Sequence, residues 1–344
     1  MLLLLALLAQ APTDRPAGET RKHLQLLQAV PESQLFLAMN AMAQSLGVSC
    51  QYCHVREGAT YQWERDDKPT KAVGRRMMKM VMDLNAGAFD GKQTVTCFTC
   101  HRGSLAARAL PDRLPVDLTK IAAPPTLPDA AAIVARYRDA VGASSRVTSP
   151  GAIVLRGTDD RSDGRHFTFD VTLEGDRILV TRTSPQGTIA QSFDGVKGWF
   201  KTADGVRELT PDQVQQLRRA ISVFRPIEMV GDTSAWKAIG LEQVGDRTAY
   251  VLATSTGPVA ARTLFFDRDT GLLLRTVATT ETAIVPLVDQ VDYDDYRLVD
   301  GVRFPFLMRM SNVAYYDTSA RKFTEIRTGV AVDDGVFNLS GRPK

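Results

Sequence analysis

The sequence predicts a multidomain α and β protein, with an N-terminal helical domain and a C-terminal antiparallel β domain. We expect the β domain to curve into a half-barrel with helices packed against it. Three observations predict this: helical spacing of apolar residues before residue 110, a proline-rich stretch after it, and alternating apolar runs beyond residue 129. At 344 residues, 44% of them hydrophobic, the chain is long enough to bury two cores.

The chain begins with an apolar run, MLLLLALLAQA, that is too short to span a bilayer. It is typical of the apolar core of a secretory signal, with Ala9-Gln10-Ala11 as a small-residue cleavage site. We therefore expect residues 1–11 to be a signal peptide and the mature protein to be periplasmic. A buried N-terminal helix is the alternative.

Residues 19–110 contain two helices that repeat each other. The first should begin near Pro31 and end at Gly47, and the second should begin at Pro69 and end near Asn85. Each carries apolar residues at i, i+4, i+7 and i+11, and the two sets are offset by 38 positions: Leu35, Met39, Met42 and Leu46, then Val73, Met77, Met80 and Leu84. The region is therefore an internal repeat of two units.

Residues 111–128 contain five of the chain's 17 prolines and predict an extended linker. The β domain then spans residues 129–344. It should start with a helix over residues 130–141 and include a polar helix over about 211–223, among about ten strands. The clearest strand segments are 166–173, 177–183, 248–254, 262–267, 271–279 and 302–310.

Each helix of the repeat leads into the same heptapeptide pattern, VSCQYCH at 48–54 and VTCFTCH at 95–101. A four-cysteine zinc site would leave the adjacent histidines unexplained, a redox CxxC would need a βαβ unit, and disulfides within CxxC would close very small loops. CxxCH is the attachment motif of c-type haem, which accounts for both thiols and the histidine. The motif residues are Cys50, Cys53 and His54 in the first copy, and Cys97, Cys100 and His101 in the second.

We therefore expect two covalently bound c-type haems, attached through the four cysteines, with His54 and His101 as iron ligands. The repeated helices also offer a methionine thioether for the sixth position of each iron. By register, the pair is either Met39 and Met77 or Met42 and Met80, and the repeat alone does not choose between them.

The stretches MNAMAQSLGVSCQYCH, RRMMKMVMDLN and VTCFTCHRG resemble the cytochrome c subunit of bacterial photosynthetic reaction centres and its non-photosynthetic relatives. The resemblance covers about residues 20–105. It implies electron transfer and assigns the axial methionines to Met39 and Met77. The reaction-centre subunit has four haems whereas this chain has two motifs, so the resemblance does not imply docking on a reaction centre.

The C-terminal part is more loosely similar to the half-barrels of periplasmic lipoprotein-carrier proteins, through DGVKGWF, DRDTGLLLR and the ending GVFNLSGRPK. In that family the concave sheet holds an acyl chain. The similarity therefore implies a lipid or lipoprotein partner for the β domain, although the same apolar residues would serve as an ordinary core.

The sequence thus predicts an exported dihaem cytochrome that carries electrons between redox protein partners by outer-sphere transfer, rather than an enzyme. The alternatives are a lipid- or lipoprotein-binding module with redox-sensing haems, and a haem enzyme with one open iron position. A net charge of +3 without a basic patch argues against a nucleic-acid partner. His23 and His166 are expected at the surface, and Arg75 and Arg76 are candidates to pair with haem propionates.

Overall fold

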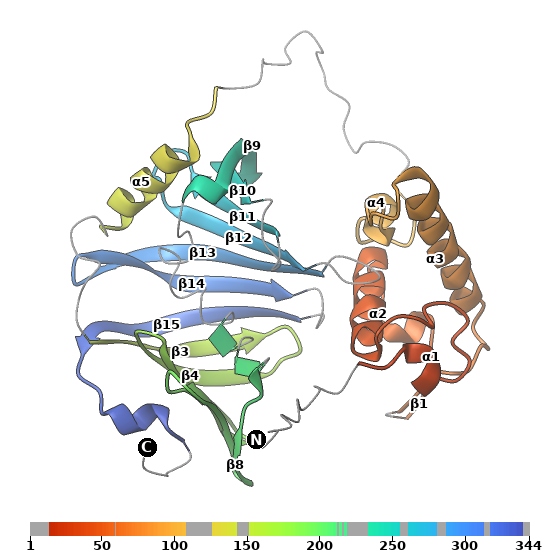
Figure 1. Cartoon of the computed structure of the whole chain (residues 1–344), viewed down its shortest axis with the longest axis horizontal. Coiled ribbons are helices and arrows are strands. Elements are labelled where there is room, and N and C mark those ends of the chain that lie inside the picture. Colours follow the sequence, from red (N-terminus) through yellow and green to blue (C-terminus); the bar gives the residue numbers. More distant parts are fainter. Residues whose placement is uncertain are drawn as a thin grey trace, which may run out of the picture. The chain divides into compact units, whose positions relative to one another are not determined.

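The computed structural model describes residues 14–58, 60–107, 126–142, 151–211, 213–214, 217–218, 233–254, 261–280, 287–312 and 317–339. The chain forms two compact units, one built mainly from the N-terminal helices and one from a large sheet. Figure 1 shows the elements of each unit with their labels. The predicted signal peptide at 1–11 lies outside the described residues, as does nearly all of the predicted linker at 111–128.

The helical unit contains the two predicted helices at nearly the predicted bounds. Helix α2 spans Glu32–Leu46 and ends at Gly47, whose left-handed φ of 65° suits a residue without a side chain. Helix α3 spans Pro69–Ala88, with its proline in the first turn, where no backbone N–H is needed. The remaining elements are α1 (Ala17–Thr20), η1 (Cys50–Tyr52), the hairpin strands β1 (Val55–Glu57) and β2 (Thr60–Gln62), and α4 (Cys97–His101).

The second unit is built on one open antiparallel sheet whose described strands number thirteen, more than the ten expected from the sequence. The strands follow the order β8-β7-β6-β5-β4-β3-β15-β14-β13-β12-β11-β10-β9. Strands β3 to β8 and strands β9 to β15 each form a series of consecutive antiparallel neighbours, and the two series join where β3 pairs with β15. The strands are β3 (Ala152–Arg161), β4 (His166–Glu174), β5 (Arg177–Ser184), β6 (Gly187–Phe193), β7 (Gly198–Thr202), β8 (Gly205–Glu208), β9 (Trp236–Val244), β10 (Arg247–Thr254), β11 (Ala261–Asp267), β12 (Leu273–Thr280), β13 (Leu287–Val299), β14 (Val302–Asn312) and β15 (Asp317–Val330).

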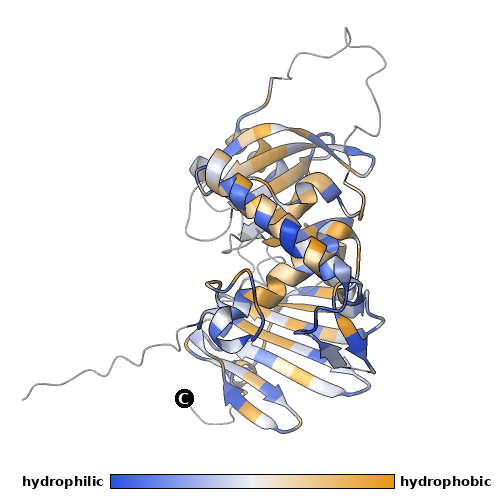
Figure 2. Cartoon of the chain, turned by 90° about the vertical axis from the view of Figure 1, so that its right-hand side faces the viewer, coloured by the Kyte–Doolittle hydropathy of each residue, from blue (hydrophilic) through white to orange (hydrophobic). Residues whose placement is uncertain are grey.

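Helix α5 (Ala130–Val141) packs its apolar side into the core of this unit, at the bounds that the sequence predicts. Asp129 caps it, since its carboxylate accepts a hydrogen bond from the backbone N–H of Ala132 at 2.6 Å. Tyr137 lies in the core, with its ring centroid 5.3 Å from that of Phe266 on β11. Figure 2 shows apolar and polar residues alternating along the strands, which is the pattern of a sheet with one buried face.

Each clear strand segment of the sequence forms a strand, with bounds within about two residues of those expected. The polar helix expected at 211–223 is only partly covered: residues 211, 213–214 and 217–218 are helical, and 219–223 lie outside the described residues. Within the described part of the chain, no helix is long and apolar enough to cross a membrane. Two short 3-10 turns, η4 (Thr233–Ala235) and η5 (Asp334–Phe337), complete the elements.

Candidate haem sites

Both CxxCH motifs form a single helical turn, so each places its two thiols three residues apart on one side. In the first motif, the backbone N–H of His54 donates to the carbonyl of Cys50 at 2.9 Å. The second motif is helix α4, which Thr96 and Thr99 begin with a capping box. All four cysteines are described and all four are free thiols. Burial is the main cause that raises the pKa of the Cys53 and Cys97 thiols.

The His101 ring is held in an orientation that suits a metal ligand. Its Nδ1 lies 3.0 Å from the carbonyl oxygen of Ser104. A carbonyl only accepts hydrogen bonds, so Nδ1 carries the ring proton and Nε2 keeps its lone pair in the neutral imidazole. Such a second bond, to the nitrogen that does not bind the metal, fixes the orientation of a ligating histidine.

His54 is half-buried beside Trp63, the residue that follows strand β2. The Trp63 ring meets the His54 ring edge-on, with centroids 5.0 Å apart, and Tyr61 stacks on Trp63 at 4.5 Å. The buried Nδ1 of His54 has no hydrogen-bond partner in the described structure. Burial, and then the charge of Lys71, lower the pKa of His54, which keeps the imidazole neutral as an iron ligand must be.

The first turn of α3 holds the first motif in place from outside. Lys68 donates to the carbonyl of Gln51, and the Thr70 hydroxyl donates to the carbonyl of Tyr52 at 2.6 Å. Lys71 donates to the carbonyl of Trp63 at 2.8 Å, which fixes the residue that covers His54. These contacts bring the second helix of the repeat against the first motif.

Asp66 anchors the same region by pairing with two cations of α3. Arg75 forms a bidentate pair with Asp66, at 2.8 and 2.9 Å, and Lys71 lies 2.8 Å from the same carboxylate. The Arg75 hydrogen bond is the main cause that holds the pKa of Asp66 well below its ordinary value of 3.8. Arg75, considered for haem propionates on sequence grounds, is therefore already engaged by Asp66, whereas Arg76 is exposed.

The second motif is fixed by a buried side chain and by the end of α2. The Asn85 amide makes two bonds to the backbone of Val95, donating to its carbonyl at 2.7 Å and accepting from its N–H at 2.9 Å. The N–H of Gly103 donates to the carbonyl of Ser45 at 2.9 Å. A Cβ at Gly47 would overlap the carbonyl oxygen of Gly103, so the two segments are in direct contact. Helix α2 of the first repeat thus supports the motif of the second.

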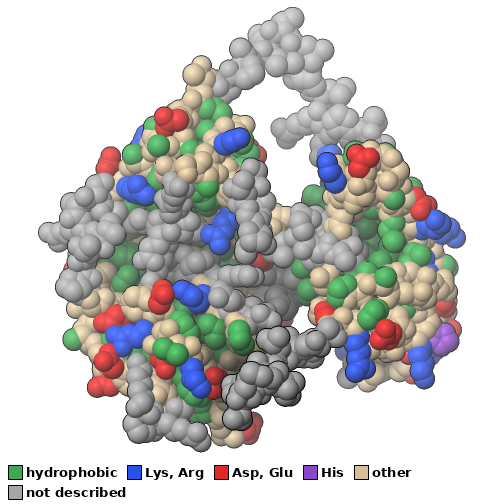
Figure 3. Space-filling model, viewed as in Figure 1, with side chains coloured by type: hydrophobic (Ala, Val, Ile, Leu, Met, Phe, Trp, Pro, Cys, Tyr) green, Lys and Arg blue, Asp and Glu red, His purple; other side chains and the backbone are tan. Residues whose placement is uncertain are grey.

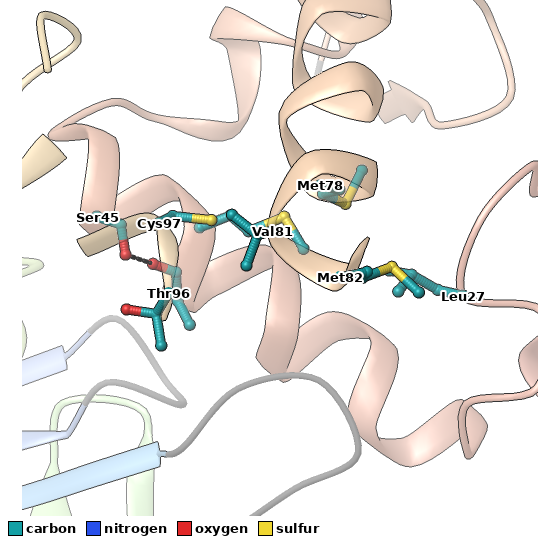
Figure 4. Close-up of a pocket in the computed structure, with 9 residues that line it drawn as sticks. Leu27, Ser45, Met78, Val81, Met82, Thr96 and Cys97 are labelled. Atoms are coloured by element: carbon teal, nitrogen blue, oxygen red, sulfur yellow. Dashed lines mark hydrogen bonds between the residues drawn. The ribbon is translucent and has the colours of Figure 1, made fainter. Parts of the chain in front are cut away.

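A hollow opens beside Cys97, between α2 and α3, and Figure 4 shows the side chains around it. It encloses about 430 Å³ of space when the part open to solvent is included. Three thioethers line it: Met42 of α2, and Met78 and Met82 of α3. Its other lining residues are Leu27, Ala41, Ser45, Val81 and Thr96.

The methionines that correspond in the two repeats differ in burial and in their surroundings in the structure. Met39 is half-buried on α2, while Met77 and Met80 are 39% and 49% exposed on α3. Of the four methionines named from the repeat, Met42 lines the hollow. Met78 and Met82 were not singled out, because the i, i+4, i+7 count selects another stripe of α3. The density of methionines in residues 77–82 was the signal that could have drawn attention to them.

Large apolar side chains around the motifs remain exposed, and Figure 3 shows such side chains on the visible face of the helical unit. Among the residues that the structure describes, fifteen large hydrophobic ones are exposed, and ten of these belong to residues 36–105. They are Phe36, Tyr52, Trp63, Val73, Met77, Met80, Met82, Leu84, Phe98 and Leu105. Free thiols, histidine rings, thioethers and exposed apolar surface are the groups that would hold and cover a c-type haem, so the residues present fit the cofactor.

The described residues do not bring three or more His, Cys, Asp or Glu side chains together as a metal site. A four-cysteine zinc site would require the two CxxC turns to converge. The other two histidines have contacts of their own: His166 with Asp160 at 2.5 Å, and His23 at 4.0 Å from Glu64. Both are exposed, as the sequence predicted.

Comparison with known proteins confirms the resemblance of the N-terminal part. Residues 6–117 match the family model of the photosynthetic reaction centre cytochrome C subunit. Over 96 residues, 27% of this chain, it is 34% identical to the photosynthetic reaction center cytochrome c subunit of Thermochromatium tepidum. It is 33% identical over 95 residues to the corresponding subunit of Roseobacter denitrificans. The chain spans about a quarter of these curated relatives, 23% and 25% of their lengths.

The C-terminal part is similar to solved structures of another kind. One is a LolA superfamily protein from Nitrosomonas europaea, with a TM-score of 0.43 and 13% identity, covering 62% of this chain and 98% of that one. Another is a DUF1329 family protein from Desulfovibrio piger, with a TM-score of 0.42 and 14% identity, covering 61% and 96%. At these scores the fold assignment rests on the sheet itself, which is antiparallel and open.

Proposed function

We propose that this protein is an exported dihaem c-type cytochrome that carries electrons between redox protein partners. The observation that supports this most strongly is the helical unit itself. Its two CxxCH turns present two free thiols and a histidine ring each, and large apolar side chains are exposed around them. When bound, haem supplies one-electron redox chemistry at its iron.

The chain's own residues have separate tasks in this proposal. Cys50 and Cys53, and Cys97 and Cys100, attach the two groups, and His54 and His101 bind the irons. The Ser104 carbonyl keeps the ring proton of His101 on Nδ1, so Nε2 stays free for the metal. The exposed apolar residues around each motif would pack against the bound haem and exclude water from it.

For the sixth ligands we propose Met39 and Met77, the pair selected by the family register. Met42 and Met80 are the alternative pair from the repeat. Met78 joins them as a candidate, because it lies with Met42 at the hollow beside Cys97. A thioether in this position closes the iron to substrates and raises its potential, as suits a carrier rather than an enzyme.

The decisive experiment is a count of covalent haems in the full chain, made with a cytochrome c maturation system. Mass spectrometry should show two haem additions for the native sequence. The pair Cys50→Ser and Cys53→Ser should leave one, and changing all four cysteines should leave none. A native chain that carries fewer than two additions contradicts the dihaem proposal.

Methionine variants then test the axial assignment. Met39→Ala and Met77→Ala should each remove the weak far-red sulfur–iron band of one haem and open that iron to carbon monoxide. Met42→Ala, Met80→Ala and Met78→Ala are the matched controls and should keep both bands. If a control loses a band while Met39→Ala and Met77→Ala keep theirs, the ligand lies elsewhere on the two helices.

We further propose a periplasmic location, since covalent haem attachment takes place outside the bacterial cytoplasm. The apolar run at residues 1–11 is the segment that would direct export. Deleting it should leave a cytoplasmic chain without haem. A deleted form that still acquires haem would contradict this assignment.

A further inference from the structure

Three arginines and one aspartate meet at one end of the core-facing side of the large sheet. Gly157 on β3 pairs with Phe169 on β4, and Phe169 pairs with Arg182 on β5. Directly paired residues share a face of the sheet, and Phe169 is in the buried core, so Arg182 faces the core side.

Two further arginines reach the same face by strand alternation. Asp159 and Arg161 lie two and four residues beyond Gly157 on β3, which places them on its face. Arg321 on β15 pairs directly with Asp159. The cluster of Asp159, Arg161, Arg182 and Arg321, called the arginine cluster below, is thus drawn from three strands, β3, β5 and β15.

The single carboxylate of the cluster is already used. Asp159 is 1% exposed, and its Oδ2 accepts a hydrogen bond from Nε of Arg321 at 3.2 Å. Its other oxygen, Oδ1, is buried without a hydrogen-bond partner. The Arg161 guanidinium lies over the Phe167 ring, 5.7 Å from its centroid. Arg321 therefore pairs with the carboxylate of the cluster, and the charges of Arg321 and Arg161 both act against the charge of Arg182.

Arg182 differs from Arg321 in having no carboxylate partner among the residues that the structure describes. It is partly buried, and within the described chain it makes no hydrogen bond and no ion pair. Burial, followed by the charge of Arg321, lowers the pKa of Arg182 to about 10, so the group stays charged at neutral pH. An unpaired guanidinium beside a core costs stability, because its lost hydration is not replaced.

We infer that the arginine cluster binds an oxyanion, a carboxylate or phosphate group, with Arg182 as its principal donor. A guanidinium matches the two oxygens of such a group with parallel N–H bonds. The bound anion would pair with the charge of Arg182. The buried Oδ1 of Asp159 also favours a ligand or water that brings a hydroxyl donor to the site. Carboxylate and phosphate groups occur both in small anions and at the ends of amphiphiles, and the experiment separates these sources.

The test uses calorimetric titration of the full haem-loaded chain with inorganic phosphate and, separately, with decanoate. We expect saturable binding of at least one of them. Arg182→Gln should weaken that binding tenfold or more, and Arg182→Lys should weaken it less because the charge remains. Arg156→Gln is the matched control: Arg156 lies on β3 between Leu155 and Gly157, on the other face, paired with Asp170 and Glu325. It removes the same charge and should leave binding unchanged.

Thermal unfolding, followed through the β-sheet signal in circular dichroism, gives an independent readout. Without ligand, Arg182→Gln should melt at or above the native temperature, because it removes an uncompensated charge. With ligand, the native chain should gain stability and the variant should not. Phosphate binding alone indicates a small anion, and decanoate binding alone indicates an amphiphile. The inference is overturned if neither binds, if Arg182→Gln binds as the native chain does, or if that variant melts lower without ligand.

Discussion

The sheet unit and the helical unit bury their apolar residues very differently. In the sheet unit, α5 and the inward-facing strand residues form one continuous core that includes Tyr137, Phe266 and Met308, each at most 2% exposed. In the helical unit, the buried hydrophobic residues are few and mostly small, such as Ala38 and Ala41, while large ones lie at the surface. The sheet unit is stabilised by packing among its own side chains. The helical unit instead exposes large apolar side chains, as a protein does where it binds an apolar group.

The difference indicates where each unit obtains its stability. Burying a large apolar side chain contributes about 1.5–3 kcal/mol, which the sheet unit gains from its strands. The helical unit leaves much of that contribution unrealised until its exposed residues are covered. Under the proposed function, haem attachment completes the core of one unit and leaves the other unaffected.

The largest expected effect comes from separating the units. A fragment of residues 129–344 should fold without haem and give a β-type circular dichroism spectrum with a cooperative melt. A fragment of residues 14–110 made without haem should lose most of its helical signal, because its apolar residues have no core to enter. A cooperative melt of the haem-free helical fragment would remove the contrast between the units.

A core truncation should affect only the sheet unit. Phe266→Ala removes a ring that is 1% exposed, so the unfolding free energy of this unit should fall by about 3–5 kcal/mol. Denaturant titration measures the loss, and the haem absorbance spectrum should be unchanged. Leu298→Ala is the matched control: Leu298 on β13 is 65% exposed, so its removal should barely change stability. Equal losses for the two variants would be inconsistent with the burial pattern.

A smaller effect is expected at the support of the second motif. Asn85→Ala removes both side-chain bonds to Val95 and leaves a partly buried backbone N–H and C=O without these partners. It should destabilise the helical unit by about 1–3 kcal/mol and lower occupancy of the second haem before the first. Haem counting by mass spectrometry, with Asp83→Ala on the exposed side of α3 as control, checks this. Equal losses at both motifs would show that the support is not specific.

The smallest effect is the pH dependence at Asp66. Its carboxyl has a lowered pKa in the folded state, so the pair with Arg75 stabilises the unit above the ordinary pKa of 3.8 and is lost as pH falls through the lower folded value. The carboxylate is 45% exposed, so Asp66→Asn should cost no more than about 1 kcal/mol at neutral pH. Denaturant titrations should show that the difference in unfolding free energy between the variant and the native chain decreases below pH 4. A difference that increases on acidification would contradict the lowered pKa of Asp66.

Sequence reasoning predicted the features that depend on neighbouring residues. Pro31 and Gly47 bracket α2, α5 has its predicted bounds, and the alternating segments all form strands, because caps, turns and periodicity act within a few positions. The strand count was too low because short strands such as β7 and β8 carry little periodic signal. Both CxxCH turns could be located from the sequence, since the motif itself is local.

The rest of the site depends on contacts between distant positions. Nothing in the local pattern indicates that Asn85 bonds to Val95, or that Ser45 accepts a bond from Gly103. The isolation of Arg182 follows from pairing across three strands, which a single sequence does not specify. The stripe of α3 that borders the hollow also depends on how the helix is rotated against α2, so Met78 and Met82 could not be chosen over their neighbours.

The contact between Gly47 and Gly103 makes each copy of the repeat depend on the other for packing. The helix of the first repeat, α2, ends in contact with the segment that follows the second motif. The two copies of the repeat therefore pack against each other and are not independent modules. Deleting one copy would strip the other of its packing partner. A single unit on its own would need another partner for this surface, for example a second copy of itself.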